Sequence, residues 1–271
     1  NGSGLDGNLS STQSAIIVKK PNTLNFYYIF TVDGITGAGG GLSYSEVDMS
    51  LNGGLGDVTA IKNIELIPDA CEKVTAIQHQ NGIDFWIIAP EDGTNIIHSF
   101  LFNSNGVDPV STQTTANSPV NGVGYLKGSP DGSRIALVNA WYLNVEVYDF
   151  DNTNGNLTHN FTIDSYSSDP YGVEFSPNSN LLYVSTWPGA YVYQYDLQAG
   201  TTVDIISSEI YLGSGGSGAG GALQLAPNNK IYQAVFNVST LPVINNPDVY
   251  GIGCNYSTNG ANLSFRTSNY G

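Results

Sequence analysis

Residues 175–185 read Phe-Ser-Pro-Asn-Ser-Asn-Leu-Leu-Tyr-Val-Ser, and this stretch decides the fold. The same pattern occurs at residues 128–138 (Gly-Ser-Pro-Asp-Gly-Ser-Arg-Ile-Ala-Leu-Val) and, with one residue fewer, at residues 225–235 (Leu-Ala-Pro-Asn-Asn-Lys-Ile-Tyr-Gln-Ala-Val). Pro, Asn, Asp, Gly and Ser favour tight turns, whereas β-branched and aromatic residues favour strands. Each copy therefore predicts a strand, a turn and a second strand.

The copies recur at a near-constant interval. Their prolines, Pro130, Pro177 and Pro227, are 47 and 50 residues apart. Two degenerate copies come earlier, at Lys20–Phe30 and Gln80–Ile88, where the same kind of turn precedes an aromatic and β-branched run. A period of 20 to 50 residues is typical of repeat architectures, so the chain contains five recognisable repeats.

Further strands follow every copy. The third strand of each repeat is predicted at Gly41–Met49, Ile96–Phe102, Asn144–Phe150, Ala190–Leu197 and Leu241–Ile244. A closing fourth strand is predicted at Gly155–Ile163 and at Thr201–Ile206. Residues 145–150 and 191–197 alternate in polarity, as strands do when one face packs and the other is wetter.

Sheets of four short antiparallel strands cannot bury both faces alone, and they stack radially as blades. We therefore predict an all-β fold, a β-propeller of four-stranded antiparallel blades, with six to seven blades in the intact ring. The rival architecture, a pair of β-sandwiches, would not require a constant period. Residues 1–271 are predicted to form a single propeller domain that is a portion of a longer secreted protein.

Composition narrows the partners. The chain has 23 acidic and 8 basic residues, a net charge of −15, so it would repel a nucleic acid backbone or an anionic membrane. No stretch approaches the roughly 20 apolar residues of a membrane-spanning helix, and we expect no direct membrane insertion. Only 11% of residues are charged, a composition common in extracellular β proteins, which favours export.

The two cysteines, Cys71 and Cys254, are too few for a disulfide framework or a four-cysteine zinc site. They either pair with each other or remain separate buried thiols. His79, His98 and His159 fall in different repeats, with no pair at metal-ligand spacing. We predict no metal and no cofactor.

One candidate ligand surface emerges from the topology. Connections between second and third strands share one face of a propeller, and they hold Glu91 and Asp92, then Trp141 and Tyr142, then Trp187 and Tyr191, then Asn237. Exposed aromatic rings suit a sugar or a protein partner, because they supply contact area at low entropic cost. We therefore predict ligand binding by four of these residues: Trp141, Tyr142, Trp187 and Tyr191. The alternative is that these rings pack between blades.

No catalytic pattern stands out. The serines form no Gly-x-Ser-x-Gly elbow, the acids are scattered among turns, and the histidines look isolated. The sequence therefore predicts that the protein is not an enzyme.

The repeats, together with residues 11–17, 44–57 and 221–227, resemble the propeller-like region of Bacteroidota cell-surface proteins associated with gliding and type IX secretion. Residues 243–247, 254–256 and 266–271 resemble that group's closing segment, so the resemblance covers nearly the whole chain. It implies export through the type IX system, and neighbouring immunoglobulin-like or polycystic-kidney-type domains before a sorting domain. Sequence before Asn1 and after Gly271 is expected by the same resemblance.

Three functions remain open at this point. The first is a non-catalytic recognition module or rigid spacer in an adhesin-like protein, with a protein or glycan partner at the cell surface. The second is a structural subunit of a surface filament or envelope assembly, in which self-assembly completes an open ring. The third is a glycan-processing propeller enzyme, which needs an acid, base or metal constellation that the sequence does not reveal.

Overall fold

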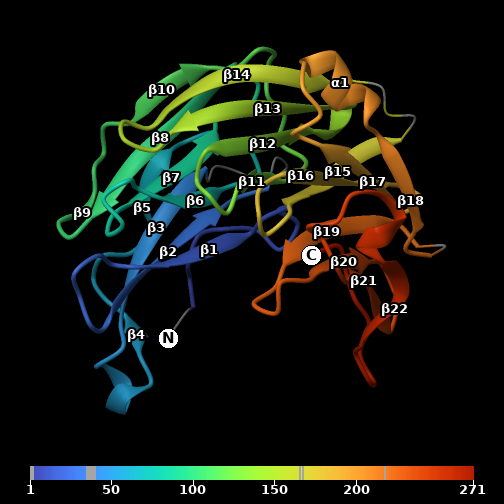
Figure 1. Cartoon of the computed structure of the whole chain (residues 1–271). Coiled ribbons are helices and arrows are strands. Elements are labelled where there is room, and N and C mark those ends of the chain that lie inside the picture. Colours follow the sequence, from blue (N-terminus) through green and yellow to red (C-terminus); the bar gives the residue numbers. More distant parts are fainter. Residues whose placement is uncertain (1–2, 35–40, 165, 167, 217) are drawn as a thin grey trace. The chain divides into compact units, whose positions relative to one another are not determined.

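The computed structural model describes residues 3–34, 41–164, 166, 168–216 and 218–271. These residues form five antiparallel sheets, each built around four strands in chain order, with an extra short strand in each of the first two (Figure 1). The predicted all-β propeller with five recognisable blades is confirmed. The total of six to seven blades in an intact ring stays a prediction.

The strands follow the chain from blade to blade. The first sheet contains β1 (Ala15–Lys19), β2 (Phe26–Val32), β3 (Leu42–Asp48), β4 (Asp57–Val58) and β5 (Ile64–Ile67), and the second contains β6 (Thr75–Gln78), β7 (Phe85–Pro90), β8 (Ile96–Asn103), β9 (Gly106–Val107) and β10 (Thr112–Thr115). The third contains β11 (Leu126–Gly128), β12 (Arg134–Asn139), β13 (Asn144–Asp151) and β14 (Asn156–Ile163), and the fourth contains β15 (Asp169–Phe175), β16 (Leu181–Trp187), β17 (Tyr191–Asp196) and β18 (Ile210–Ser214). The fifth contains β19 (Gly220–Leu225), β20 (Ile231–Val235), β21 (Thr240–Ile244) and β22 (Tyr256–Asn262). The helical segments are α1 (Thr202–Ser207) and the 3-10 turns η1 (Asn52–Gly54), η2 (Ala140–Tyr142) and η3 (Gly251–Cys254).

The repeated turn has a local physical cause. In the third and fourth blades the serine before the proline accepts a backbone N–H five residues later, Arg134 to Ser129 and Leu181 to Ser176, each at 2.9 Å. The same hydroxyl donates to the Asx side chain two residues on, for example Ser129 to Asp131 at 2.6 Å. Such side-chain bonds close the turn without help from the rest of the fold.

The predicted closing strand at Thr201–Ile206 is wrong, because residues 202–207 form α1 and the fourth strand of that blade is β18. Thr201 and Asp204 make a capping box, in which each side chain bonds the other residue's backbone N–H. This reciprocal cap satisfies the first amides of a helix and outweighs the strand preference of Val203, Ile205 and Ile206. The closing strand predicted at Gly155–Ile163 is confirmed as β14.

The chain divides into two compact units. Unit 1 comprises Asn1–Val123 and Phe150–Thr158, and unit 2 comprises Gly124–Asp149 and His159–Gly271. Unit 1 has an aromatic core in which Tyr28, Phe30 and Phe102 pack with ring centroids 4.7 to 6.3 Å apart. Unit 2 has two apolar clusters, which pack neighbouring sheets against each other.

Cys71 and Cys254 are both buried and free, so the alternative of two separate thiols holds.

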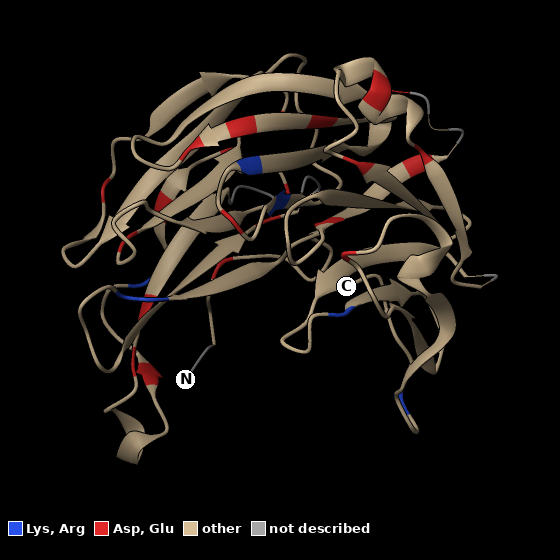
Figure 2. Cartoon of the chain, in the orientation of Figure 1, with Lys and Arg blue, Asp and Glu red and all other residues tan. Residues whose placement is uncertain are grey.

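No helix within the described part of the chain has the length and apolar character needed to cross a bilayer. Acidic segments outnumber basic ones in the ribbon (Figure 2), in keeping with the net charge of −15.

Candidate active site

The structure places the four predicted aromatic residues in unit 2, at the connections where the sequence put them. Trp141 and Tyr142 lie in η2 between β12 and β13, with 62% and 54% of their surface exposed. Trp187 ends β16 and Tyr191 begins β17, with 40% and 36% exposed. These exposures show that the rings are not buried between blades. Ligand binding by these rings stays a prediction.

The histidines differ from one another more than the sequence suggested. His79 stacks obliquely on Trp86 with ring centroids 5.7 Å apart, and His159 packs edge-on against Tyr148 at 5.6 Å. His79 Nδ1 also accepts the Asn81 N–H at 3.0 Å, and His159 Nε2 lies 2.9 Å from Thr162 Oγ1. His98, in contrast, joins a serine to a glutamate.

The side chains of a serine, a histidine and a glutamate are linked by two consecutive polar contacts in unit 1. The His98 Nδ1 atom lies 2.8 Å from Ser111 Oγ, and its Nε2 atom lies 3.4 Å from Glu91 Oε2. With the proton on Nε2, the ring donates a hydrogen bond to Glu91, and Nδ1 accepts a hydrogen bond from the Ser111 hydroxyl. A nucleophile bonded to a base, which is in turn oriented by a carboxylate, hydrolyses esters on several unrelated folds. In that triad the nucleophile bonds Nε2 and the carboxylate bonds Nδ1, whereas in this protein the two ring nitrogens are exchanged.

Strand register brings these three side chains to one face of the second blade. Thr112 of β10 pairs with Ser99 of β8, and Gln113 pairs with His98. Because side chains alternate between faces, Ser111 and Gln113 point to the same face as His98. Glu91 follows β7 and bonds Ile96 through its N–H, so its carboxylate also reaches that face.

Neighbouring residues hold His98 and the segment around Ser111 in place. The His98 ring stacks on Phe100, with centroids 5.8 Å apart and planes 8° from parallel, and its residue is 9% exposed. On the opposite face of β10, Thr112 Oγ1 donates to Asn154 O at 3.1 Å and Thr114 Oγ1 accepts from Leu157 N at 3.1 Å. These bonds fix the edge strand next to Ser111. The histidine is thus buried and oriented, whereas Ser111 is only half-buried.

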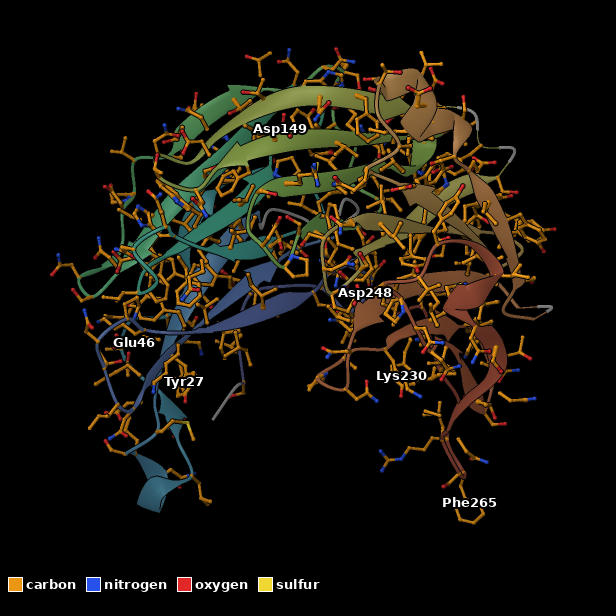
Figure 3. The ribbon with its side chains drawn as sticks, viewed as in Figure 1. Tyr27, Glu46, Asp149, Lys230, Asp248 and Phe265 are labelled. Carbon is orange, nitrogen blue, oxygen red and sulfur yellow. The ribbon has the colours of Figure 1, made fainter. Side chains whose placement is uncertain are left out.

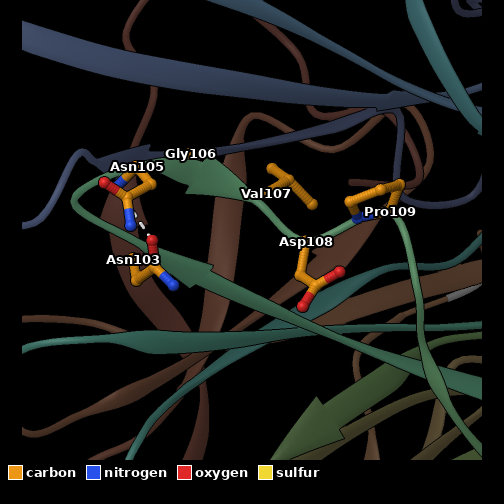
Figure 4. A pocket seen from close by; sticks show the side chains of 6 residues that line it. All are labelled: Asn103, Asn105, Gly106, Val107, Asp108 and Pro109. Carbon is orange, nitrogen blue, oxygen red and sulfur yellow. Dashed lines mark hydrogen bonds between the residues drawn. The ribbon is translucent and has the colours of Figure 1, made fainter.

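A pocket of about 270 Å³ lies on the same blade, in the connection that leads from β8 to β10 (Figure 4). Its lining residues are Asn103, Asn105, Gly106, Val107, Asp108 and Pro109. Pro109 precedes Ser111 by two residues, so their Cα atoms are at most about 7 Å apart. Gly106 has a φ of +113°, and a Cβ there would lie 3.3 Å from the Tyr28 hydroxyl, so glycine suits this wall of the pocket.

A second group of polar side chains in unit 1, Glu72 and Lys73, has a structural role. The segment Cys71–Lys73 precedes β6, and Glu72 Oε2 accepts both the backbone N–H and the hydroxyl of Thr12 at 2.9 Å. Lys73 is completely buried, and its Nζ donates to the carbonyls of Asn121 and Val123 at 2.9 and 3.0 Å. Burial lowers the pKa of Lys73 to about 8. All these bonds tie neighbouring segments of the chain together.

In unit 2 the innermost strands of three consecutive blades meet in one polar group. Lys127 Nζ of β11 lies 3.1 Å from Glu174 Oε2 of β15 and donates to Gln224 Oε1 of β19 at 2.8 Å. Glu174 also accepts the N–H groups of Phe175 and Leu225. Its carboxylate oxygens are therefore already paired, which suits a latch between blades better than a reacting group. Within the described residues there is no group of three or more His, Cys, Asp and Glu placed to hold a metal ion.

No protein-family model and no curated protein sequence matches this chain. Solved structures do resemble it. A protein from Bacteroides uniformis provisionally named 6-phosphogluconolactonase is 12% identical, with a TM-score of 0.54 over 92% of this chain and 86% of that one. The periplasmic gluconolactonase of Pseudomonas aeruginosa is 12% identical, with a TM-score of 0.55 over 86% of this chain and 67% of that one.

Sqt1 from Chaetomium thermophilum is 14% identical, with a TM-score of 0.55, and 96% of this chain covers 63% of it. The chain thus spans less than two thirds of that structure. At such identities the likeness shows the propeller fold alone. The same fold carries proteins of different names, two of which are named as lactonases.

These comparisons correct the functional interpretation of the sequence. The prediction of a non-catalytic recognition module, spacer or structural subunit is wrong, because solved propellers that resemble the chain include two named as lactonases. The prediction that the protein is not an enzyme is wrong for the same reason. Sequence reasoning also missed the link from Ser111 to Glu91. Glu91 directly follows β7, His98 lies on β8 and Ser111 directly precedes β10, so the pairing of β8 with both β7 and β10 brings the three side chains together.

Proposed function

We propose that this protein is a propeller hydrolase that opens lactones, which are cyclic esters, with Ser111 as nucleophile, His98 as general base and Glu91 as the group that orients the histidine. The observation that carries the proposal is the pair of contacts made by His98, 2.8 Å to Ser111 and 3.4 Å to Glu91. The names of two structural relatives support the choice of a lactone.

Each group has a defined part in the reaction. Ser111 Oγ forms a bond to the carbonyl carbon while its proton moves to His98 Nδ1. The tetrahedral intermediate collapses, the bond from the carbonyl carbon to the ring oxygen breaks, and His98 gives its proton to that oxygen. Water, deprotonated by His98, then attacks the acyl-serine, the bond from the acyl carbon to Ser111 Oγ breaks, and His98 returns the proton to Oγ. The products are free Ser111 and the open hydroxy acid.

Glu91 acts through the histidine. Its carboxylate accepts from Nε2, which keeps the Nδ1 atom free to take the serine proton and stabilises the imidazolium that forms. The contact of 3.4 Å is long for a hydrogen bond, as catalytic contacts often are before substrate binds.

The test combines covalent labelling with turnover. A fluorophosphonate probe, followed by peptide mass spectrometry, should modify Ser111 once per chain. Hydrolysis of δ-gluconolactone, measured in a pH-stat above the spontaneous rate, should fall at least about a thousandfold in Ser111→Ala and His98→Gln. Glu91→Gln should retain more activity than either variant.

Ser104→Ala is the matched control, because Ser104 is an exposed serine of the same blade. It should be labelled and should turn over substrate like the wild type. Labelling elsewhere, or full activity in Ser111→Ala, would reject the proposal.

We also propose that the protein works outside the cytoplasm, as expected from its resemblance to exported Bacteroidota surface proteins. Two observations support this: only 11% of residues are charged, and one structural relative is named as periplasmic. Fractionation of cells that produce the full-length protein, with detection by antibody, tests the proposal; recovery in the cytoplasmic fraction alone would contradict it.

A further inference from the structure

The carboxylates around the proposed nucleophile restrict its substrate. Glu91 contacts His98, and Asp92 follows it directly, with its carboxylate 3.7 Å from Cys71 Sγ. Asp108 lines the pocket, is exposed, and accepts the Val110 N–H at 3.0 Å. Glu91 and Asp108 are therefore the carboxylates that a substrate reaching Ser111 from the pocket would meet, whereas Asp92 faces the buried Cys71 thiol.

The cations of unit 1 are engaged elsewhere. Lys20 pairs with Glu46 at 3.2 Å in the first blade, and Lys62 donates to Ser3 O at 2.7 Å. Lys73 is the basic residue whose charge acts on Asp92, but its Nζ is completely buried against two carbonyls and cannot touch a ligand. The remaining one, Lys19, lies on β1 of the first blade, and both arginines belong to unit 2.

A phosphorylated substrate would need what this region lacks. Phosphate groups are bound by arginine or lysine side chains, or by the N–H groups at a helix start or a nest. No arginine and no lysine is among the residues that line the pocket. A phosphate in the pocket would instead approach the carboxylate of Asp108, whose repulsion acts within about 8 Å at physiological salt.

We infer that the substrate is an uncharged sugar lactone rather than a phosphorylated one. This inference rests on the proposed function and selects between the substrates that the names of the two lactonase relatives suggest. The pocket offers groups that suit sugar hydroxyls: the side-chain amides of Asn103 and Asn105 and the carboxylate of Asp108 (Figure 4). Amides both donate and accept hydrogen bonds, and a carboxylate accepts them.

The experiment compares two lactones that differ by one phosphate. We expect kcat/KM for δ-gluconolactone to exceed that for its 6-phosphate at least about tenfold at low ionic strength, and the ratio to shrink as salt is added. Asp108→Lys should shift the ratio toward the phosphorylated lactone several-fold. Asp6→Lys makes the same change of net charge at an exposed position outside the pocket and should leave the ratio unaltered.

The outcomes separate the two proposals. Equal or faster turnover of the phosphorylated lactone, with Ser111 still labelled, would overturn the inference that the substrate is uncharged but would agree with the proposed hydrolase function. Turnover of neither lactone, with no labelling of Ser111, would overturn the proposed hydrolase function itself.

Discussion

The hydroxyl of Ser176 accepts a hydrogen bond from the backbone N–H of Leu181 at 2.9 Å, across the turn that repeats from blade to blade. Ser129 makes the equivalent bond to Arg134, also at 2.9 Å. In the fifth blade the equivalent position is Ala226, and the turn is one residue shorter, with Ala226 N–H donating to Lys230 O.

This comparison predicts unequal effects of removing or adding the hydroxyl. Ser176 is fully buried, so Ser176→Ala should lower the free energy of unfolding by about 1 to 2 kcal/mol, because the Leu181 N–H loses its partner. Ala226→Ser should change it by less than about 0.5 kcal/mol, since the shorter turn already pairs its backbone. Urea denaturation followed by fluorescence measures both. A loss no larger in Ser176→Ala than in Ala226→Ser would contradict this account of the turn.

Replacing Trp86 and replacing Trp141 with alanine should have very different effects on the stability of the protein. Trp86 is 6% exposed, its Nε1 donates to Asn152 O at 2.9 Å, and its ring occupies the space that a side chain at Gly155 would take. Trp86→Ala should therefore destabilise the protein by about 3 to 5 kcal/mol. Trp141→Ala should stay within about 0.5 kcal/mol, because Trp141 is 62% exposed. Thermal melts of both variants provide the measurement, and a large loss in Trp141→Ala would show that this ring supports the fold.

The sequence was sufficient for the blades because their turns are made by local contacts. Ser129 and Asp131 close their turn within a few residues, so the pattern alone carries the information. The cap of α1 is local as well. Val203, Ile205 and Ile206 favour a strand, but the capping box of Thr201 and Asp204 outweighs them, so the strand predicted at this position is wrong.

The candidate site was beyond local reasoning. His98 lies on β8, and Ser111 is thirteen residues further along the chain, directly before β10. The register of β8 and β10 depends on the β9 hairpin between them. A shift of one residue would turn Ser111 to the other face of the sheet. The exposed positions of Trp141 and Trp187 were predictable because they follow from strand order alone.

Contacts between blades provide a further prediction. Several join the turns of neighbouring blades in unit 2. Asp131 N–H donates to Ser179 Oγ at 3.1 Å, and Asn178 N–H donates to Asp248 at 2.9 Å. Asp248, labelled in Figure 3, lies in the connection between β21 and β22. The pair of Lys127 and Glu174 also links two blades, with side chains 13% and 5% exposed.

Replacing only one residue of the Lys127 and Glu174 pair should lower the free energy of unfolding more than replacing both residues with apolar ones. Glu174→Leu alone leaves a lysine without its carboxylate and two N–H groups without an acceptor, so we expect a loss of about 3 kcal/mol in the free energy of unfolding. The double variant Lys127→Met with Glu174→Leu should recover part of that loss. A double-mutant cycle measured by urea denaturation tests this, and strict additivity of the two single changes would mean that the charges do not interact.

The buried amine of Lys73 predicts how stability depends on pH. Its pKa is about 8 in the folded protein and 10.5 in the unfolded chain, so between these values the unfolded chain binds more protons and stability rises with pH. Cys71 acts in the opposite direction above its ordinary pKa of 9, because burial raises the pKa of its thiol to about 12. The gain should therefore be measured between pH 7.5 and 9.

Over that range the free energy of unfolding should rise by about 1 kcal/mol more in the wild type than in Lys73→Met. Lys62→Met serves as the control, because Lys62 is half-exposed and its Nζ donates to a carbonyl near the start of the described chain. It should keep the wild-type slope, and a Cys71→Ala background should extend the rise beyond pH 9. An identical slope in wild type and Lys73→Met would mean that the buried lysine stays charged throughout this range, and that its bonds to Asn121 and Val123 compensate for its burial.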